Sequence, residues 1–178
     1  MSKIGRKPIE LGSVQVEVQG QEVRYSGKHA KGTHLFPPLL KVGVEGNTVV
    51  ITAARQTADT NRLWGLHRAL FANKITGAEK GFQKQVSIVG LGFKATKKGA
   101  GLEFSLGFSH KIDFPFPKEV TIDIDKTGQL LTAWSSNKEL LGQVCSDICA
   151  LRPSEPYKGT GVFLAGSRIR RKAGKAKV

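Results

Sequence analysis

The chain has 178 residues, of which 39% are hydrophobic and 24% charged, a composition typical of a globular protein rather than a disordered one. Its 28 Lys and Arg residues against 14 Asp and Glu residues give a net charge of +14, which favours an anionic partner such as nucleic acid, an acidic membrane surface or an acidic protein. No apolar run approaches the ~18–20 residues of a membrane span, the first residues lack a secretory signal pattern, and two cysteines do not make a disulfide framework, so we expect a cytoplasmic protein.

The positive charge is concentrated at the two ends of the chain. Lys3, Arg6 and Lys7 precede the first acid, Glu10, and the 23 residues after Glu155 contain seven Lys or Arg residues and no acid. The residues between these ends carry a net charge of only +4. A basic composition that served solubility alone would be spread evenly, so the concentration predicts two surfaces that contact an anionic partner.

The first half of the chain has the patterns of two β-hairpins. "VQVEV" alternates with the period of a half-buried strand, and "EVRYSG" follows it after a turn at "QGQ". "LKVGVEGNTVVITA" predicts a second hairpin, with its bend at "EGN". Together they predict a small antiparallel sheet.

A helix follows these hairpins. Asp59 or Thr60 is suited to cap its first turn, the helical period runs to about Ile75, and Gly77 is suited to end it. His67 falls on the apolar face, where it is predicted to be a core or boundary residue.

The second half repeats the order of the first. "QVSIVG" and "LEFSLGF" predict strands, and "EVTIDIDKTGQLLTAW" predicts a hairpin with its turn at "DKTG". A helix capped by Ser136 or Asn137 then runs to about Ala150, and Pro153 prevents its continuation.

Residue matches at a constant offset support an internal duplication. Phe36-Pro37 matches Phe114-Pro115 at an offset of 78, and Leu63-Trp64-Gly65 matches Leu140-Leu141-Gly142 at 77. We therefore predict an α+β protein made of two tandem copies of a small antiparallel sheet plus one helix. The predicted repeats are 1–82, with the basic N-terminal segment, and 83–178, with a basic C-terminal arm.

"VSIVGLGFKA" contains the spacing Gly90-x-Gly92-x-x-Ala95 of a dinucleotide-binding turn. That site needs a helix directly afterwards, whose N-terminus meets the pyrophosphate. Here "TKKGAGLEF" follows, with two glycines and then a strand pattern, so we interpret the motif as a bend between strands. The rim of this bend carries Lys94, Lys97 and Lys98.

No catalytic or metal-binding pattern is present in the sequence. Cys145 and Cys149 share a helix face, but no further Cys or His cluster completes a metal site, so we interpret them as buried apolar residues. The chain has no Ser/His/Asp order and no Walker loop. We predict that it is not an enzyme and has no metal, no cofactor and no small-molecule substrate.

The C-terminal arm has the composition of a phosphate-binding element. Tyr157-Lys158 combines a ring able to stack on a base with a cation able to neutralise a phosphate, and three glycines allow close backbone approach. Arg168, Arg170 and Arg171 supply planar donor forks suited to phosphate oxygens. The alternatives are a solvated tail and a nuclear-localisation signal in "RIRRK".

The chain resembles, nearly end to end, the bacterial-type large-subunit ribosomal protein L-six family. The resemblance lies in "SKIGRKPIELG", "KGFQKQVSIVGLGFKA", "LEFSLGFSHKI" and above all "RPSEPYKGTGVFLAGSRIRRKAGK". It implies a structural constituent of the large subunit that binds 23S-type rRNA chiefly through the second repeat and its arm. It further implies a place near the stalk base and the sarcin–ricin loop, beside neighbouring ribosomal proteins and away from membranes.

The predicted RNA-binding residues combine this resemblance with the charge pattern. The family's arm motif falls on Tyr157, Lys158, Gly159 and Gly161, and its basic close on Arg170, Arg171, Lys172 and Lys175. The charge pattern adds Arg168, Lys177, Lys94, Lys97, Lys98, Lys3, Arg6 and Lys7. The alternative functions are a nucleic-acid-binding module that acts off the ribosome and a nucleotide-dependent enzyme that uses the Gly90 bend.

Overall fold

The hairpins predicted in the first half are present in the computed structural model, which describes residues 2–54, 57–99 and 101–175. Strand β2 (Gln15–Gln19) pairs with β3 (Glu22–Ser26), and β5 (Leu40–Glu45) pairs with β6 (Thr48–Ala53), each antiparallel with the predicted bend. Two strands that the sequence pattern missed complete the sheets: β4 (Lys31–Leu35) pairs with β3, and the two-residue β1 (Ile9–Glu10) pairs with β6.

Helix α1 (Ala58–Glu79) is longer at both ends than predicted. Its N-cap is Thr57, whose hydroxyl accepts a hydrogen bond from the Thr60 backbone N–H at 3.2 Å, so the predicted caps Asp59 and Thr60 lie inside the first turn. Gly77 does not end the helix. It is buried within the last turn. Glycine in a helix costs about 1 kcal/mol of stability relative to Ala, and the burial of this turn offsets that cost.

One face of α1 closes the core of the first unit. Trp64, Phe71 and Ile75 are buried on it, and they pack with residues of the two sheets such as Val23 and Val49. The Trp64 indole N–H donates to the Ile51 carbonyl at 2.8 Å, which satisfies its polar atom within the apolar core.

The second half has a four-stranded antiparallel sheet in the order β11-β12-β7-β13 and a three-stranded sheet in the order β10-β9-β8. The strands are β7 (Phe82–Val89), β8 (Lys94–Lys98), β9 (Gly101–Ser105), β10 (Ile112–Pro115), β11 (Thr121–Ile124), β12 (Leu130–Ser135) and β13 (Gly161–Leu164). Strands β8, β10 and β13 were not predicted from the sequence pattern. Phe82, which that pattern assigned to the first repeat, is the first residue of β7.

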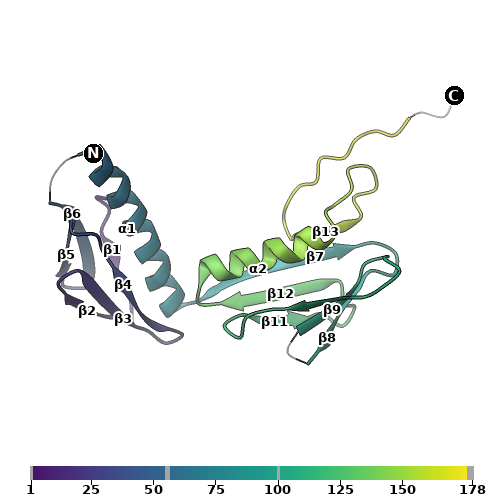
Figure 1. Ribbon diagram of the computed structural model, residues 1–178, viewed down its shortest axis with the longest axis horizontal. Coiled ribbons are helices and arrows are strands. Elements are labelled where there is room, and N and C mark those ends of the chain that lie inside the picture. Colours follow the sequence, from purple (N-terminus) through teal and green to yellow (C-terminus); the bar gives the residue numbers. More distant parts are fainter. Residues whose placement is uncertain (1, 55–56, 100, 176–178) are drawn as a thin grey trace. The chain divides into compact units, whose positions relative to one another are not determined.

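Helix α2 (Lys138–Leu151) begins directly after its predicted caps and ends one residue beyond Ala150. It runs along the sheet that contains β7 and β12 (Figure 1). Leu141, Val144, Cys145 and Ile148 are its buried residues, and they form one core with residues of both sheets.

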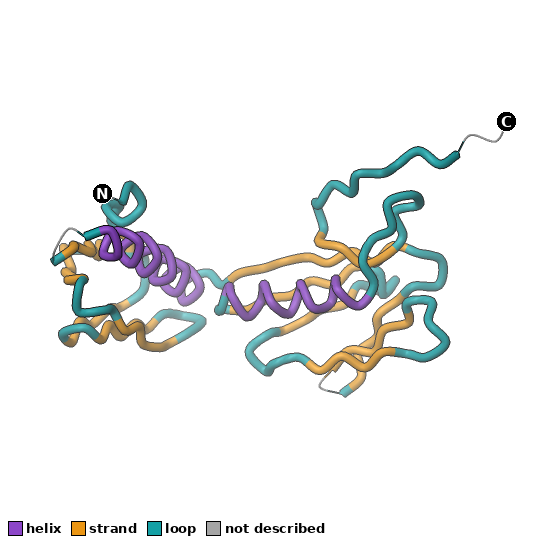
Figure 2. The backbone as a smooth tube through the Cα atoms, turned by 45° about the horizontal axis from the view of Figure 1, so that its top comes forward, coloured by secondary structure: helices purple, strands orange, loops and turns teal. Residues whose placement is uncertain are grey.

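The two halves share the same order of elements, which confirms the tandem α+β prediction. In the first, β1-β6-β5 forms one sheet and β2-β3-β4 the other; in the second, the equivalents are β7-β12-β11 and β8-β9-β10. In each copy the helix follows the last strand of these two sheets, β6 or β12, and in the second copy β13 comes after it; the helices are the purple segments beside orange strands in Figure 2. The offset of 77 matches buried Trp64 with buried Leu141 and buried Phe71 with buried Ile148.

The chain divides into two compact units. The first contains the residues up to Gly81 and the second those from Phe82 onward, except that 136–138 are grouped with the first. Neither of the helices that the structure describes is long and apolar enough to cross a membrane.

Candidate nucleic-acid interface

The C-terminal arm is anchored in the core of the second unit. Strand β13 pairs with β7 over Gly161–Leu164, and the Val162 side chain is 2% exposed. The Val162 N–H donates to the Arg152 carbonyl at 2.8 Å, and the Ala165 N–H donates to the Gln85 carbonyl at 2.8 Å. The residues before and after β13 therefore emerge from fixed points on the sheet edge.

The residues before β13 form a closed loop, Glu155–Thr160. The Glu155 N–H donates to the Thr160 carbonyl at 2.8 Å, and the Gly159 N–H donates to the Glu155 carbonyl at 3.0 Å. The Thr160 hydroxyl donates to the Glu155 carboxylate at 3.2 Å. The loop thus presents Tyr157, which is 55% exposed, and Lys158 to solvent.

The basic residues after β13 return to this loop. Ser167 closes a turn by donating its N–H and hydroxyl to the Leu164 carbonyl at 3.0 and 2.7 Å. The Lys172 N–H then donates to the Pro156 carbonyl at 2.9 Å. A Cβ atom on Gly159 would lie 3.0 Å from a guanidinium nitrogen of Arg171, so the side chain of this arginine lies directly against the loop.

This return path brings together the two parts of the arm motif. Tyr157, Lys158 and Gly159 lie next to Arg171 and Lys172, although more than ten residues separate them in the sequence. We call this group the arm cluster. It combines an exposed aromatic ring with three cations, which are groups that contact bases and phosphates, whereas Gly159 is buried against the Arg171 side chain.

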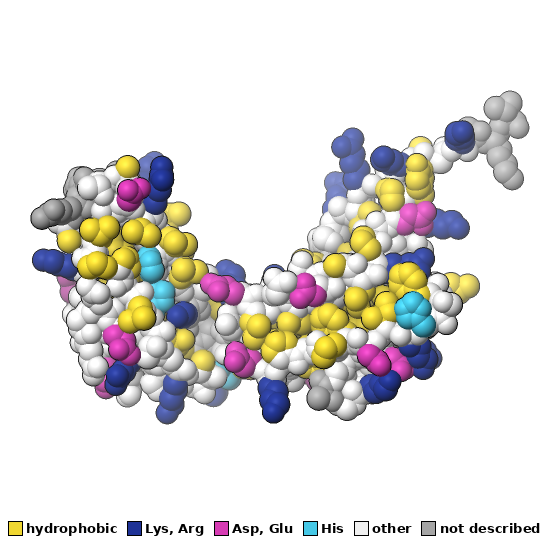
Figure 3. Space-filling model, viewed as in Figure 1, with side chains coloured by type: hydrophobic (Ala, Val, Ile, Leu, Met, Phe, Trp, Pro, Cys, Tyr) yellow, Lys and Arg dark blue, Asp and Glu magenta, His cyan; other side chains and the backbone are white. Residues whose placement is uncertain are grey.

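The remaining arm cations are exposed around this cluster. Arg168 and Arg170 are exposed on either side of the partly buried Ile169, and together with Arg171 they line a hollow of about 550 Å³. Across the described part of the arm, no Lys or Arg forms an ion pair with a carboxylate. Dark-blue basic side chains accordingly follow the arm in Figure 3. Lys175 is also exposed, and Lys177 lies outside the described residues.

The Gly90 bend leads into strand β8, not into a helix. The helix N-terminus that a dinucleotide site requires is therefore missing after Ala95. Lys94 and Lys97 are exposed on opposite faces of β8. The structure places both in the second unit, on an element separate from the arm.

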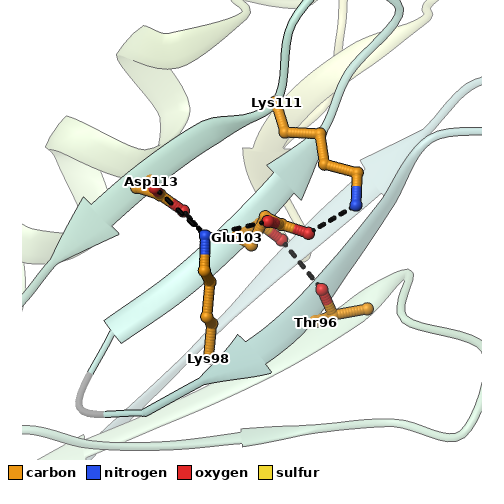
Figure 4. A network of polar contacts seen from close by, with 5 residues as sticks. All are labelled: Thr96, Lys98, Glu103, Lys111 and Asp113. Atoms are coloured by element: carbon orange, nitrogen blue, oxygen red, sulfur yellow. Dashed lines mark hydrogen bonds and ion pairs between the residues drawn. The ribbon is translucent and has the colours of Figure 1, made fainter.

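Lys98 differs from these two lysines because its charge is offset (Figure 4). Its ammonium group lies 3.1 Å from an Asp113 carboxylate oxygen and 3.2 Å from one of Glu103, while Lys111 contacts Glu103 at 2.8 Å. Hydrogen bonds to Asp113 and Glu103 raise the pKa of Lys98, and those from Lys111 and Lys98 lower the pKa of Glu103. The two carboxylates lower the positive potential around this ammonium group, so it should attract a phosphate less strongly than Lys94 or Lys97 does.

Lys3, Arg6 and Lys7 lie in the first unit, where the N-terminal segment is bound to α1. The Arg68 guanidinium donates to the Lys7 and Pro8 carbonyls at 3.1 and 2.9 Å. All three basic side chains are exposed on this segment. These residues belong to the first unit, and the arm cluster belongs to the second.

The two cysteines behave as apolar residues. Cys145 is fully buried and Cys149 partly so, and burial raises the pKa of both thiols. Within the described ranges, no group of three His, Cys, Asp or Glu side chains is arranged to hold a metal ion.

Sequence reasoning missed the residues that shape the arm. Glu155 and Thr160 close the loop, and Arg152 accepts the hydrogen bond that fixes Val162. All three lie within the arm motif, but their residue types do not indicate these roles, so only the hydrogen-bond partners identify them.

Known proteins similar to this chain cover its whole length. The sequence pattern of ribosomal protein L6 matches residues 89–163. The large ribosomal subunit proteins uL6 of Bdellovibrio bacteriovorus and of a Synechococcus strain (JA-3-3Ab) are 41% and 35% identical to it. Each alignment covers 99% of this chain and 97–98% of the relative. The chain belongs to the ribosomal protein L6 family.

A third relative shows that this similarity is not confined to one repeat. The uL6 protein of Magnetococcus marinus is 38% identical over 178 residues, which is 99% of this chain and 100% of the relative. L6 proteins are structural, non-enzymatic components of the ribosome, so the prediction that the chain is not an enzyme agrees with its family.

Proposed function

We propose that this L6 protein binds large-subunit, 23S-type rRNA through its second unit, with the arm cluster and the arm cations as the main contact. Its place would be near the stalk base and the sarcin–ricin loop, next to neighbouring ribosomal proteins of the cytoplasmic ribosome. The family supports the ribosomal role. The position at the stalk base rests on the resemblance of the sequence to that family.

The observation that carries the proposal is the convergence of exposed, unpaired cations on one loop. Arg171 and Lys172 return to Tyr157 and Lys158 without any carboxylate partner in the described arm. Like charges that converge repel one another, so the arrangement gains little from the folded protein itself. A polyphosphate ligand supplies the missing counter-charge.

The cations of this surface are suited to recognising the shape of RNA through its phosphates, not its base sequence. Guanidinium forks and ammonium groups bind phosphate oxygens, which position a nucleic acid without reading its bases. A-form RNA presents phosphates and 2′-hydroxyls over a shallow minor groove, which such groups can reach. We therefore expect the arm to hold RNA helices in place with little direct base readout.

Removal of residues Ser167–Val178 tests the proposal. The deletion removes six of the seven arm cations and leaves β13 intact. Each phosphate contact releases counterions, at about 0.7–0.9 units of slope per contact. With about four of the six removed cations on phosphates, the slope of log K against log salt should flatten by roughly 3–4 units. The measurement is a salt titration of binding to a large-subunit rRNA fragment, with full-length and truncated protein.

Matched lysine and arginine variants serve as controls. Arg171→Ala should reduce affinity for all RNA fragments and lower the slope by about one contact, because its guanidinium lies in the arm cluster. Lys98→Ala should leave the slope nearly unchanged, because two carboxylates already offset that charge. An unchanged slope for a truncated protein that remains folded would show that the arm is a solvated tail.

A further inference from the structure

A stack of four planar side chains lies at one end of the second unit, beside the start of the arm. The Arg152 guanidinium lies over two aromatic rings, with its central carbon 4.9 Å from the Phe93 ring centre and 5.0 Å from that of Phe108. The His110 ring stacks on Phe108, with 6.1 Å between ring centres and 24° between ring planes. The order of the stack is Phe93, Arg152, Phe108, His110.

Two backbone features position this stack. The Arg152 guanidinium also donates a hydrogen bond to the Leu106 carbonyl, which fixes the group over the two rings. Gly107 has a φ of 75°, and a Cβ atom there would lie 2.8 Å from the Phe93 ring, so a side chain at this position would push the loop away. The stack therefore depends on a backbone position that favours glycine.

The stack runs from the core to the solvent. Phe93 is 9% exposed and belongs to the hydrophobic core, whereas Phe108 is 45% exposed and His110 is exposed. The outer end of the stack, formed by Phe108 and His110, is therefore open to solvent and accessible to a further planar group.

The same residue that orders the stack also anchors the arm. The Arg152 carbonyl accepts the hydrogen bond from Val162 of β13, while its guanidinium packs against Phe108. Arg152 therefore connects the stack to the strand from which the arm leaves the second unit. The Arg152 guanidinium places a positive charge against the Phe108 ring. A positive charge beside an aromatic surface attracts the electron-rich face of a nucleobase.

We propose that Phe108 and His110 form a stacking platform for an unpaired nucleobase of the RNA that the arm binds. This inference rests on the proposed function, and it adds a base contact to a surface otherwise built for phosphates. Unpaired bases in RNA loops and bulges stack on aromatic rings and guanidinium planes, whereas paired bases are not available to them. An apolar protein partner is the competing occupant, and the fully exposed Leu91 of the neighbouring bend is the residue it would use.

The test separates stacking from both charge and apolar burial. Phe108→Leu keeps an apolar side chain but removes the aromatic face, so the full-length variant should bind an rRNA fragment with loops about 5- to 150-fold more weakly. The salt slope should remain that of the wild type, because no phosphate contact is lost. Phe108→Tyr should retain the wild-type affinity, and Leu91→Ala should leave RNA binding unchanged.

A fluorescence measurement on the unaltered protein gives an independent readout. The probe is the same fragment with 2-aminopurine in place of single unpaired adenines. Wild-type protein and Phe108→Tyr should quench one of these positions by stacking, and Phe108→Leu should not.

The outcomes distinguish this inference from the proposed function. Wild-type affinity and quenching for a folded Phe108→Leu protein, with a normal salt slope, would overturn the stacking platform and leave RNA binding by the arm intact. A loss of affinity that came with a flatter slope would also overturn it, because the residue would then act through the arm. If Phe108→Leu failed to fold, the absence of any quenched position with wild-type protein would overturn it.

Discussion

The two histidines of the first unit show how burial changes a single side chain. His34 is 7% exposed, and its ring lies in edge-to-face contact with Phe36 and 5.7 Å from Phe71, measured between ring centres. One of its nitrogens lies 3.1 Å from a ring nitrogen of the partly buried His67, which is the boundary position predicted for that residue. Burial, Lys74 and His67 together lower the pKa of His34 to about 4.

This low pKa predicts that acid destabilises the first unit. The unfolded chain binds a proton at His34 below pH 6.5, while the folded chain does so only below about pH 4, so stability is lost as the pH falls between these values. The loss should reach about 3 kcal/mol. His34→Leu should remove most of this dependence, as followed by urea unfolding with NMR signals of the first unit at pH 6.5 and 4.5.

The control for this prediction is an exposed histidine of the same unit. His29→Gln should keep the wild-type dependence on pH, because His29 is exposed in the folded protein. A wild-type His34 ring that titrates near pH 6.5 in the folded state would contradict the prediction.

At the scale of an element, the arm is more ordered than its composition indicates. A solvated tail was one alternative for this segment, yet Gly161–Leu164 form β13 and Val162 enters the core. The pairing depends on Gly161, which has a φ of 138°. A Cβ atom at this position would lie 2.6 Å from the Ser154 Cα and 2.7 Å from the Pro153 carbonyl oxygen.

Gly161→Ala should therefore weaken the attachment of the arm. The positive φ and the close backbone contact should cost about 1–3 kcal/mol, which lowers Tm by roughly 2–4 °C per kcal/mol in a protein of this size. RNA affinity should fall as well, because β13 joins the two parts of the arm cluster. Calorimetry and the RNA titration measure these effects.

Gly174→Ala is the matched control for this variant. A Cβ atom on Gly174 meets no atom within 4 Å, so the substitution should change neither Tm nor affinity. Equal Tm values for Gly161→Ala and the wild type would show that β13 does not hold the arm.

At the scale of the whole molecule, the duplication accounts for the fold. Each copy has its own hydrophobic core, and the two cores have no residue in common. The offset of 77 places residues of equal burial on the two helices, although Trp64 and Phe71 differ in size from Leu141 and Ile148. Volume differences of this kind are accommodated by the neighbouring side chains of each core.

We expect the second unit to fold on its own. A fragment from Phe82 to Val178 contains all the strands of its two sheets, helix α2 and a complete core. It should show a cooperative thermal transition and dispersed NMR amide signals, because its apolar residues bury one another within the fragment. The fragment should also bind rRNA with most of the salt slope of the intact protein.

The starting residue provides a control for this expectation. Phe82 packs against the core and pairs with Ser135, so a fragment that begins at Lys84 should be less stable than one that begins at Phe82. A fragment from Phe82 that behaves as a random coil, while the intact chain folds, would contradict separate folding of the two units.

The sequence by itself determined the features that depend on local pattern. Alternating apolar residues and turn residues located the hairpins β2–β3, β5–β6 and β11–β12, and the helical period located α1 and α2. The repeat offset and the arm motif then identified two α+β copies and the family. Each of these patterns can be recognised from neighbouring residues along the chain, without knowing which residues contact one another in the fold.

Only the tertiary structure decided the features that depend on partners distant in sequence. Strands β8 and β13 lack an alternating apolar pattern and exist because β9 and β7 supply their hydrogen bonds. Lys94 and Lys98 look alike in the sequence, yet Glu103 and Asp113 offset only the charge of Lys98. The arm cluster and the Phe108 stack likewise depend on hydrogen bonds between residues distant in sequence, from Lys172 to Pro156 and from Arg152 to Leu106. The role of a charged or aromatic side chain depends on the groups that the fold places beside it.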